Sequence, residues 1–202
     1  STLTEKQTAS LFDTGTLTSE DALIRAKDVE EMTGHFLMFN EMLKTYQEPL
    51  SHELMKRYHY KLKSGVFEDI ANGYPIGEYK NCRNIVSDIT TALPEDVHAR
   101  MTTLLDEYNA ADKHDLHGLA KFHADYEAIH PFQDGNGRIG RLIAFKQCLK
   151  NNYIPFYIDD ANKWLYYRGL REWKSEKNYL IETCRFGQDQ YKMLLNYFGI
   201  KC

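Results

Sequence analysis

The chain has 202 residues, of which 43% are hydrophobic and 27% are charged, and a formal net charge of −4. This length and composition predict one domain over residues 1–202 with a sizeable core, and the charge gives little support to a nucleic-acid or membrane surface. No apolar run approaches about 18 residues and no signal peptide is recognisable, so we expect a cytoplasmic protein.

The N-terminal part predicts one long helix. The first dozen residues show little periodicity, and the turn-forming residues of segment 13–20 come before the helix. The helix is expected to start near Glu20, because the preceding threonine or serine can cap it, and its apolar pattern continues to Leu43. Gly34 is a candidate break, since glycine costs a helix about 1 kcal/mol relative to alanine.

The next part of the chain predicts a helix, a loop and a hairpin. The helix covers 50–62 and ends at Ser64-Gly65, as helices commonly do at glycine. Glycines and a proline in 73–77 mark the loop, and the segments 82–86 and 89–92 then flank a two-residue turn. An isolated hairpin needs packing support to persist, so a surface ribbon without a function is the alternative interpretation.

Two further helices lead to the centre of the sequence. One is predicted from Pro94, and the other carries apolar residues at three- and four-residue steps up to Ile129. His130 precedes a proline, which disfavours helical backbone, so His130 is expected on a turn at the helix end. A new helical pattern begins after 135–137, which places these residues in a loop that enters a helix.

The segment 130–141 combines a base, a carboxylate, glycines and two guanidiniums. Amides at a helix start bind anions, and Arg138 and Arg141, three residues apart, suit a chain of phosphates. Asp134 would repel phosphate unless a divalent cation, typically magnesium, joined them. His130 can take a proton from a hydroxyl near neutral pH. The segment therefore predicts transfer of a nucleotide or phosphoryl group to a hydroxyl.

Each residue of this segment also has a simpler interpretation by itself. His130 could only end a helix, Asp134 could be an ordinary turn residue, and the arginines could be solvated surface. Their joint occurrence favours a functional site. Phe132 is the exception, because an aromatic residue in a polar loop more often packs in the core than contacts a ligand.

The stretch from His130 to Arg141 resembles the motif of the Fic (filamentation induced by cAMP) domain, His-Pro-Phe-x-Asp/Glu-Gly-Asn-Gly-Arg-x-x-Arg, at every fixed position. A weaker resemblance extends from about Thr14 to Trp173. The resemblance implies an all-α, Fic-type helical bundle with a short β-hairpin flap over the active site. It also implies a protein adenylyltransferase, an enzyme that transfers AMP from ATP to a tyrosine, threonine or serine hydroxyl of a target protein.

The resemblance implies a role for each motif residue. His130 would be the base that deprotonates the target hydroxyl, and Asp134 would hold the magnesium ion bound to ATP. Arg138 would contact the inner phosphates and Arg141 the γ-phosphate. The loop residues that would form the anion hole are Gly135, Asn136 and Gly137.

Two further parts of the site are implied outside the motif. Residues 81–92 look like the family's flap, which pairs with the backbone of the target segment, and Ile85 or Val86 would clamp the target. Tyr166 or Tyr167, on the helix after the motif, is expected to touch the adenine base. Packing in the core is the alternative for both tyrosines.

Residues 1–19 resemble a degenerate inhibitory region. Many Fic proteins carry the sequence Ser/Thr-x-x-x-Glu-Gly/Asn, whose glutamate pairs with the second arginine of the motif, here Arg141. The gapless match places Ala9 at the Ser/Thr position and Asp13-Thr14 at Glu-Gly, and aspartate is one methylene shorter than glutamate. We therefore expect Arg141 to be weakly inhibited or free, with self-modification. The alternatives are that Asp13 still reaches it, or that a separate antitoxin-like protein supplies the glutamate.

Several functions remain open besides AMP transfer. The same motif supports removal of AMP from a modified protein, another nucleotide or phosphoryl transfer, or nucleotide binding without turnover. Intact His130 and Asp134 favour an enzyme, and the related Doc-type kinases have lysine where this chain has Gly137, so AMP transfer is favoured. The expected partners are ATP and a target protein.

Overall fold

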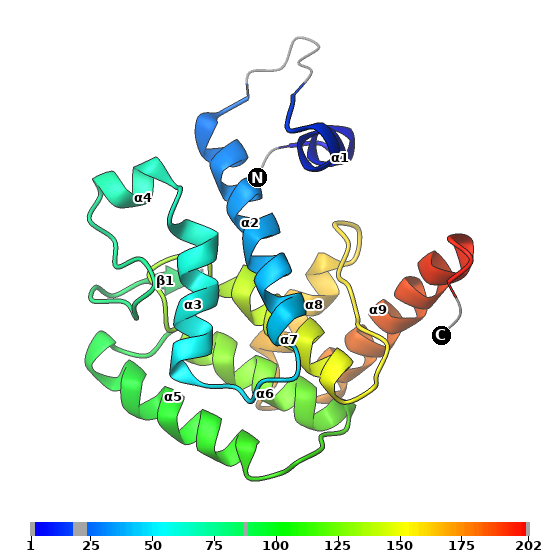
Figure 1. Cartoon of the computed structure of the whole chain (residues 1–202). Helices are drawn as coiled ribbons and strands as arrows, with labels where there is room; N and C mark the ends of the chain where they lie inside the picture. Colours follow the sequence, from blue (N-terminus) through cyan, green and yellow to red (C-terminus); the bar gives the residue numbers. More distant parts are fainter. Residues whose placement is uncertain (1–2, 18–23, 87–88, 201–202) are drawn as a thin grey trace.

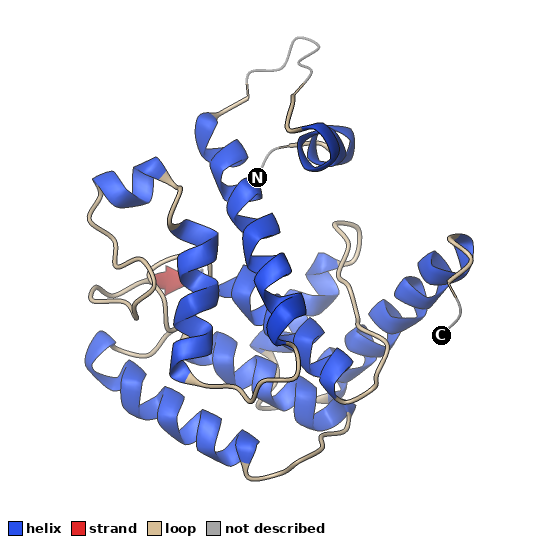
Figure 2. Cartoon of the chain, in the orientation of Figure 1, coloured by secondary structure: helices blue, strands red, loops and turns tan. Residues whose placement is uncertain are grey.

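The computed structural model describes residues 3–17, 24–86 and 89–200, and these form helices with one short hairpin (Figures 1 and 2). The strands β1 (Ile85–Val86) and β2 (Ile89–Thr90) pair antiparallel. The helices are α1 (Glu5–Thr14), α2 (Ala26–Thr45), α3 (His52–Lys63), α4 (Phe67–Ala71), α5 (Pro94–Asn109), α6 (Leu116–Ile129), α7 (Asn136–Lys150), α8 (Lys163–Arg171) and α9 (Asn178–Tyr197). The predicted all-α class is confirmed.

Helix α1 was not predicted from the sequence. Thr4 caps it, because its hydroxyl accepts from the Gln7 amide while the Gln7 side chain accepts from the Thr4 amide. None of its residues is buried, and the ring of Phe12 packs edge-on against Phe36 of α2, with 4.8 Å between centroids. The threonine and the glutamine three residues later were the sequence signal that could have predicted this helix.

Helix α2 differs from the prediction at its start and at Gly34. It begins at Ala26 rather than near Glu20, which lies outside the described residues, and it continues unbroken through Gly34. A β-carbon on Gly34 would lie 2.1 Å from the carbonyl oxygen of Leu62 in α3. The glycine is therefore a contact point that lets the two helices approach closely.

We expect Gly34→Ala to destabilise the protein although alanine is the better helix former. The new methyl group would meet backbone rather than a movable side chain, so α2 and α3 must separate, at a cost of about 1–3 kcal/mol or more. Urea unfolding measures this loss. Gly65→Ala is the matched control, since a β-carbon at that position would have no other atom within 4 Å. Equal stability of the two variants would disprove the close-contact interpretation.

The core lies where α2, α3, α5, α6 and α7 pack together, and α9 packs against both α6 and α8. Tyr58, Tyr126 and Ile139 are fully buried there. Because α6 ends and α7 begins inside this packed group, the segment between them is held on a rigid base. Within the described ranges, none of the helices has the length and hydrophobicity of a membrane-spanning segment.

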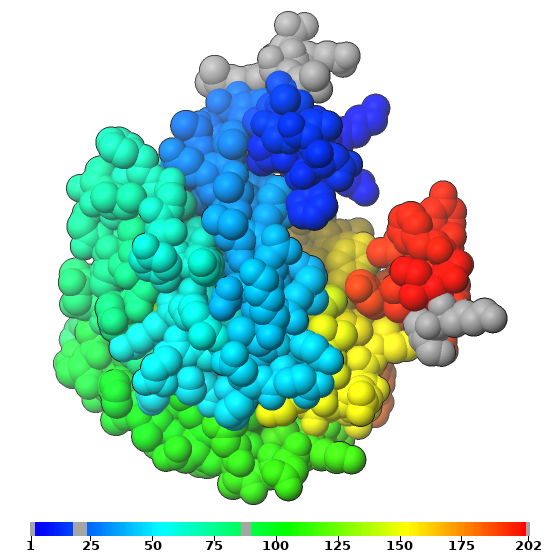
Figure 3. All heavy atoms as spheres, viewed as in Figure 1, coloured from blue at the N-terminus to red at the C-terminus, as the bar shows by residue number. Residues whose placement is uncertain are grey.

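Helix α9 packs mainly through its first half. Its buried residues lie between Leu180 and Gly187, whereas Met193 is 64% exposed and Tyr197 is 83% exposed. Figure 3 shows the C-terminal end of this helix, in red, projecting from the body of the molecule. Tyr191 still packs edge-on against Phe145 of α7, with 5.9 Å between ring centroids, so it is the part of the helix after Tyr191 that is largely exposed.

Candidate active site

The motif segment is a tight turn between α6 and α7. His130 ends α6 in the left-handed region, with φ 54° and ψ 63°, and its amide donates to the carbonyl of Tyr126 at 2.9 Å. Gly135 precedes α7 with φ 82°, a conformation that favours glycine. The predicted position of His130 on a turn at the helix end is confirmed.

The side chain of Asn136 holds this turn in shape. Its carbonyl oxygen accepts from the Phe132 amide at 2.8 Å, and its amide nitrogen donates to the Phe132 carbonyl at 2.7 Å. Phe132 is fully buried and stacks on His59, with 4.2 Å between ring centroids, so its predicted role in the core is confirmed. Asn136 can thus contribute to anion binding only through its backbone.

The start of α7 offers unpaired amides to an anion. The first amide bonded within the helix is that of Ile139, which donates to the Gly135 carbonyl at 3.0 Å. The amides of residues 136–138 therefore have no partner inside the helix. They lie at the positive end of the helix dipole, which favours a bound phosphate.

A cavity of about 790 Å³ opens over these amides. Such a volume is typical of small-molecule sites. Asn84 and Ile85 of the flap line it, together with Glu127 of α6 and Leu170 of α8. The predicted residues that line it are His130, Asp134, Gly135, Asn136, Gly137, Arg138, Arg141, Tyr166, Tyr167 and Ile85. The side chain of Val86 lies outside the described part of the structure.

His130 is suited to accept a proton. Burial, together with the nearby charge of Lys80, lowers its pKa to about 4, so the ring is neutral at pH 7. Its Nδ1 lies 3.3 Å from the backbone carbonyl oxygen of Glu127. The carbonyl can only accept, so this contact favours the tautomer with the proton on Nδ1 and leaves the lone pair on Nε2.

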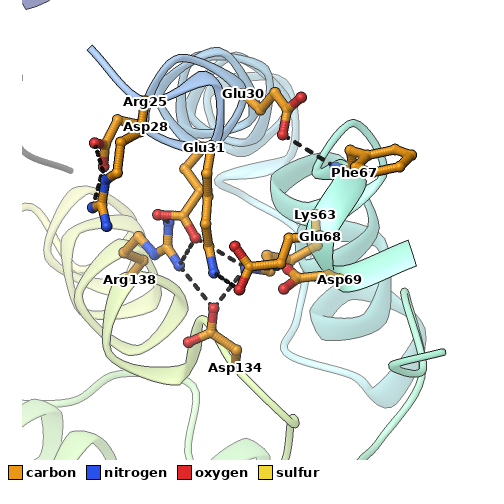
Figure 4. Close-up of polar contacts among 11 residues, drawn as sticks. Arg25, Asp28, Glu30, Glu31, Lys63, Phe67, Glu68, Asp69, Asp134 and Arg138 are labelled. Carbon is orange, nitrogen blue, oxygen red and sulfur yellow. Dashed lines mark hydrogen bonds and ion pairs between the residues drawn. The ribbon is translucent and has the colours of Figure 1, made fainter. Parts of the chain in front are cut away.

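Asp134 of the motif turn belongs to a cluster of five charged residues, whose other members lie on α2, α3, α4 and α7 (Figure 4). Its Oδ2 lies 2.6 Å from Nζ of Lys63 and 3.3 Å from Nη2 of Arg138. Lys63 also pairs with Asp69 and with Glu31, the latter at 3.1 Å, and Glu31 pairs with Arg138 at 2.9 Å. Three carboxylates and two cations leave the cluster with one net negative charge.

This cluster keeps Asp134 ionised. Burial alone would raise its pKa, but the hydrogen bond and charge of Lys63, with the charge of Arg138, outweigh that effect and lower the pKa to about 2. The side chain is 48% exposed at the edge of the cavity. A charged, accessible carboxylate remains available to a divalent cation at neutral pH.

The donor set near Asp134 fits magnesium carried by a polyphosphate. The described residues contain no group of three or more metal-ligating side chains. Magnesium commonly takes one or two carboxylates and completes its shell with phosphate oxygens and water. Asp134 beside an anion-binding turn matches that arrangement.

Arg141 points back across the start of α7. A β-carbon on Gly137 would lie 3.2 Å from its Nη1, and its guanidinium lies 6.0 Å from the ring centroid of Tyr166. Among the described residues no carboxylate pairs with Arg141 within 4.0 Å, and Asp13 is exposed at the end of α1. The side chain is thus not neutralised by an ion pair within the described part.

The two tyrosines of α8 have different surroundings. Tyr166 is 2% exposed, and its hydroxyl lies 2.7 Å from Nε2 of the buried His123. Tyr167 is 57% exposed, and Trp164 on the same helix is 59% exposed. Packing in the core, the alternative for both tyrosines, therefore holds for Tyr166 and not for Tyr167.

The base of the flap is tied to the motif turn. The ammonium of Lys80 donates to Asn84 at 2.7 Å and to Thr91 at 3.1 Å, which joins the two sides of the hairpin. Asn84 also donates to the Phe132 carbonyl at 2.8 Å, and the Lys80 amide donates to the Pro131 carbonyl at 2.9 Å. Ile85 remains 87% exposed, free to contact another chain.

Sequence reasoning missed Glu127, Lys63 and Glu31. Glu127 carries a weak signal, because an acidic residue in the last turn of a helix is disfavoured by the helix dipole. Lys63 and Glu31 carry none, since each is one charged position in an amphipathic helix far from the motif. Only the packing of α2, α3 and α7 brings them to Asp134.

Comparisons with known proteins agree with this geometry. The model of the Fic/DOC family matches residues 49–148, which include the whole motif. The protein adenylyltransferase Fic of Nematostella vectensis is 30% identical over 108 residues, 51% of this chain and 25% of the relative. This chain thus matches only about a quarter of that curated relative.

Solved structures share the fold. A Fic domain containing signaling protein from Bacteroides thetaiotaomicron matches with a TM-score of 0.82 at 24% identity, over 99% of this chain and 82% of the other. Fic-1 from C. elegans matches with a TM-score of 0.76 at 16% identity, over 97% and 59% of the two chains. These likenesses show a shared fold, and the family match over residues 49–148, which includes the whole motif, shows that the chain belongs to the Fic/DOC family.

Proposed function

We propose that this protein is an adenylyltransferase that moves AMP from ATP to a hydroxyl group of a target protein. One observation carries the proposal: a single cavity joins the neutral imidazole of His130 to the unpaired amides of residues 136–138. Arg138 and Arg141 line the same cavity, and Arg141, which no carboxylate of the described residues pairs with, adds positive charge for a polyphosphate. The adenylyltransferase activity in the name of the Nematostella relative supports the same reaction.

The transfer requires a base and a held phosphate chain. The target hydroxyl gives its proton to Nε2 of His130 while its oxygen forms a bond to the α-phosphorus. The bond from the α-phosphorus to the bridging oxygen breaks, and pyrophosphate leaves with that electron pair. The amides of residues 136–138 stabilise the charge on the phosphate oxygens, and Arg141 orients the outer phosphate.

Asp134 would hold a magnesium ion, which neutralises phosphate charge when bound. The residue's own contribution is to stay ionised at the edge of the cavity, as Lys63 and Arg138 ensure. Tyr167, which is exposed on the cavity wall, is the better placed of the two tyrosines to contact the base.

The flap would dock the target segment. A short hairpin with free backbone groups can pair with an extended peptide, and its base is fixed to the turn that carries His130. Ile85 would then pack against the target side chain. Val86 would follow it along the docking edge.

Intact-mass analysis after incubation with ATP tests the proposal. We expect the chain, or an added target, to gain one AMP with magnesium present and nothing when a chelator removes it. A gain of phosphate would indicate a kinase instead, and ATP binding without any mass gain would indicate a binding module. Loss of AMP from a previously modified protein would indicate the reverse reaction.

Self-modification should show whether residues 1–19 control the site. Because Asp13 forms no ion pair with Arg141, we expect the isolated chain to modify itself and Asp13→Ala to do so equally fast. Thr14→Glu restores a longer carboxylate near the family position and should slow self-modification. A silent wild type that Asp13→Ala activates would show that the shorter side chain still inhibits, whereas slowing by Thr14→Glu would show that this segment lies over the site and has lost only its charge.

A further inference from the structure

Glu127 places a buried carboxyl group beside the proposed base. Its Oε2 lies 3.6 Å from Nδ1 of His130, one helical turn away, and its side chain is 12% exposed. Its Oε1 has no hydrogen-bond partner among the described residues, although it is buried. Burying a polar atom without a hydrogen-bond partner costs free energy, so the presence of this carboxyl group at a buried position needs an explanation.

The fold makes room for this carboxyl group. A β-carbon on Gly140 of α7 would lie 2.4 Å from Oε1, so only glycine leaves the space that Oε1 occupies. Glu127 also lies in the last turn of α6, where the helix dipole disfavours a negative charge. Burial raises its pKa to about 7, although the charge of Arg141 acts in the opposite direction.

Of the groups around Glu127, His130 is the one that can take up a proton and form an ion pair with the carboxylate. The titratable and charged groups around the carboxyl are His123 and Tyr126 of α6, His130 at the end of α6, Arg141 of α7 and Tyr166 of α8, and His130 also faces the charges of Lys80 and Asp134. Burial lowers the pKa of His123 to about 3 and raises the pKa of both tyrosines well above the usual value for tyrosine.

We propose that Glu127 and His130 form a carboxyl–imidazole dyad, in which Glu127 is a positioning residue that stabilises the protonated imidazole. The backbone carbonyl of Glu127 accepts the Nδ1 proton and fixes the ring, and the carboxylate supplies charge 3.6 Å away. When Nε2 takes the proton of the target hydroxyl, the ring becomes an imidazolium held against a negative charge. This role in catalysis rests on the proposed transfer, but the dyad itself does not.

Titration of the His130 ring by NMR tests the dyad without any substrate. Two coupled groups lose their protons in two shared steps, so the wild-type ring signals should move near pH 7 and again near pH 4. Glu127→Gln keeps the shape but cannot ionise, and its His130 signals should move once, near pH 4. His130→Ala identifies the signals. Identical titration curves in wild type and Glu127→Gln would overturn the dyad.

The pH profile of transfer tests its use in catalysis. The wild-type transfer rate should rise as Glu127 ionises near pH 7, and the rate of Glu127→Gln should lack that rise. Above pH 7 the variant should be roughly 10- to 100-fold slower than the wild type, which is part of the rate enhancement that a general base contributes. Its ATP binding and unfolding temperature should match the wild type. Glu107→Gln, an exposed site on α5, is the control and should keep the wild-type profile.

The two tests separate the two proposals. A wild type that shows both titration steps but no AMP transfer refutes the adenylyltransferase and leaves the dyad standing. Transfer by a protein whose His130 titrates identically with and without Glu127 refutes the dyad alone. Matching pH profiles for Glu127→Gln and wild type would refute its role in catalysis.

Discussion

His130→Ala is expected to slow AMP transfer by about 10²- to 10⁴-fold or more, the range that a general base contributes, while ATP binding stays close to that of the wild type. The imidazole acts on the target hydroxyl, whereas the phosphates are held by the amides at the start of α7 and by the two arginines. Asn136 and Phe132 maintain that turn without help from the imidazole. Chemistry and binding should therefore separate.

Intact-mass time courses measure the transfer, and a fluorescent ATP analogue measures the binding. His117→Ala is the matched control, because His117 lies exposed on the same helix and contacts Trp173 rather than the cavity. Wild-type rates in His130→Ala would refute the assignment of the base. Loss of ATP binding together with transfer would show that the imidazole holds the turn in shape.

The site was predictable where short-range rules determine it. A proline after His130 and glycines on either side of Asn136 fix a helix end, a turn and a helix start within a few residues. The hairpin was found for the same reason, although each strand has two residues rather than the four or five expected. Such features need no knowledge of the rest of the chain.

Features that depend on packing were not predictable. Gly34 was interpreted by its helix propensity, but the proximity of Leu62 in α3 decides its role. Glu127 gains its function from its distance to His130 and from the space at Gly140. The partners of Asp134 are as far as 71 residues away in sequence, and only the tertiary fold brings them together.

Lys63→Met is expected to cost about 3–5 kcal/mol of unfolding free energy, the range for removing one partner of a buried ion pair. The Lys63 side chain is 2% exposed and contacts three carboxylates, those of Glu31, Asp69 and Asp134. Methionine fills similar volume but leaves these three groups with Arg138 as their remaining cation in the cluster. Lys27→Met, which breaks the more exposed pair with Glu68, is the control and should cost no more than about 1 kcal/mol.

A second substitution should recover part of this loss. Asp69 is 3% exposed and contacts Lys63, whereas Glu31 and Asp134 both also contact Arg138. Adding Asp69→Asn to Lys63→Met removes the carboxylate that has lost its partner, so the double variant should be more stable than Lys63→Met. A double variant that is no more stable would show that the lysine contributes packing rather than charge.

The pH dependence gives an independent test of the same cluster. In the wild type the pKa of Asp134 is about 2 and that of Glu31 is lowered, so both carboxylates contribute stability above their unfolded pKa values of about 4. That contribution is lost as the pH falls toward 2. In Lys63→Met the crowded carboxylates favour protonation instead, which raises their pKa. Urea unfolding should therefore show the deficit of Lys63→Met shrinking from pH 7 to pH 4, and a deficit that stays constant would rule out an electrostatic cause.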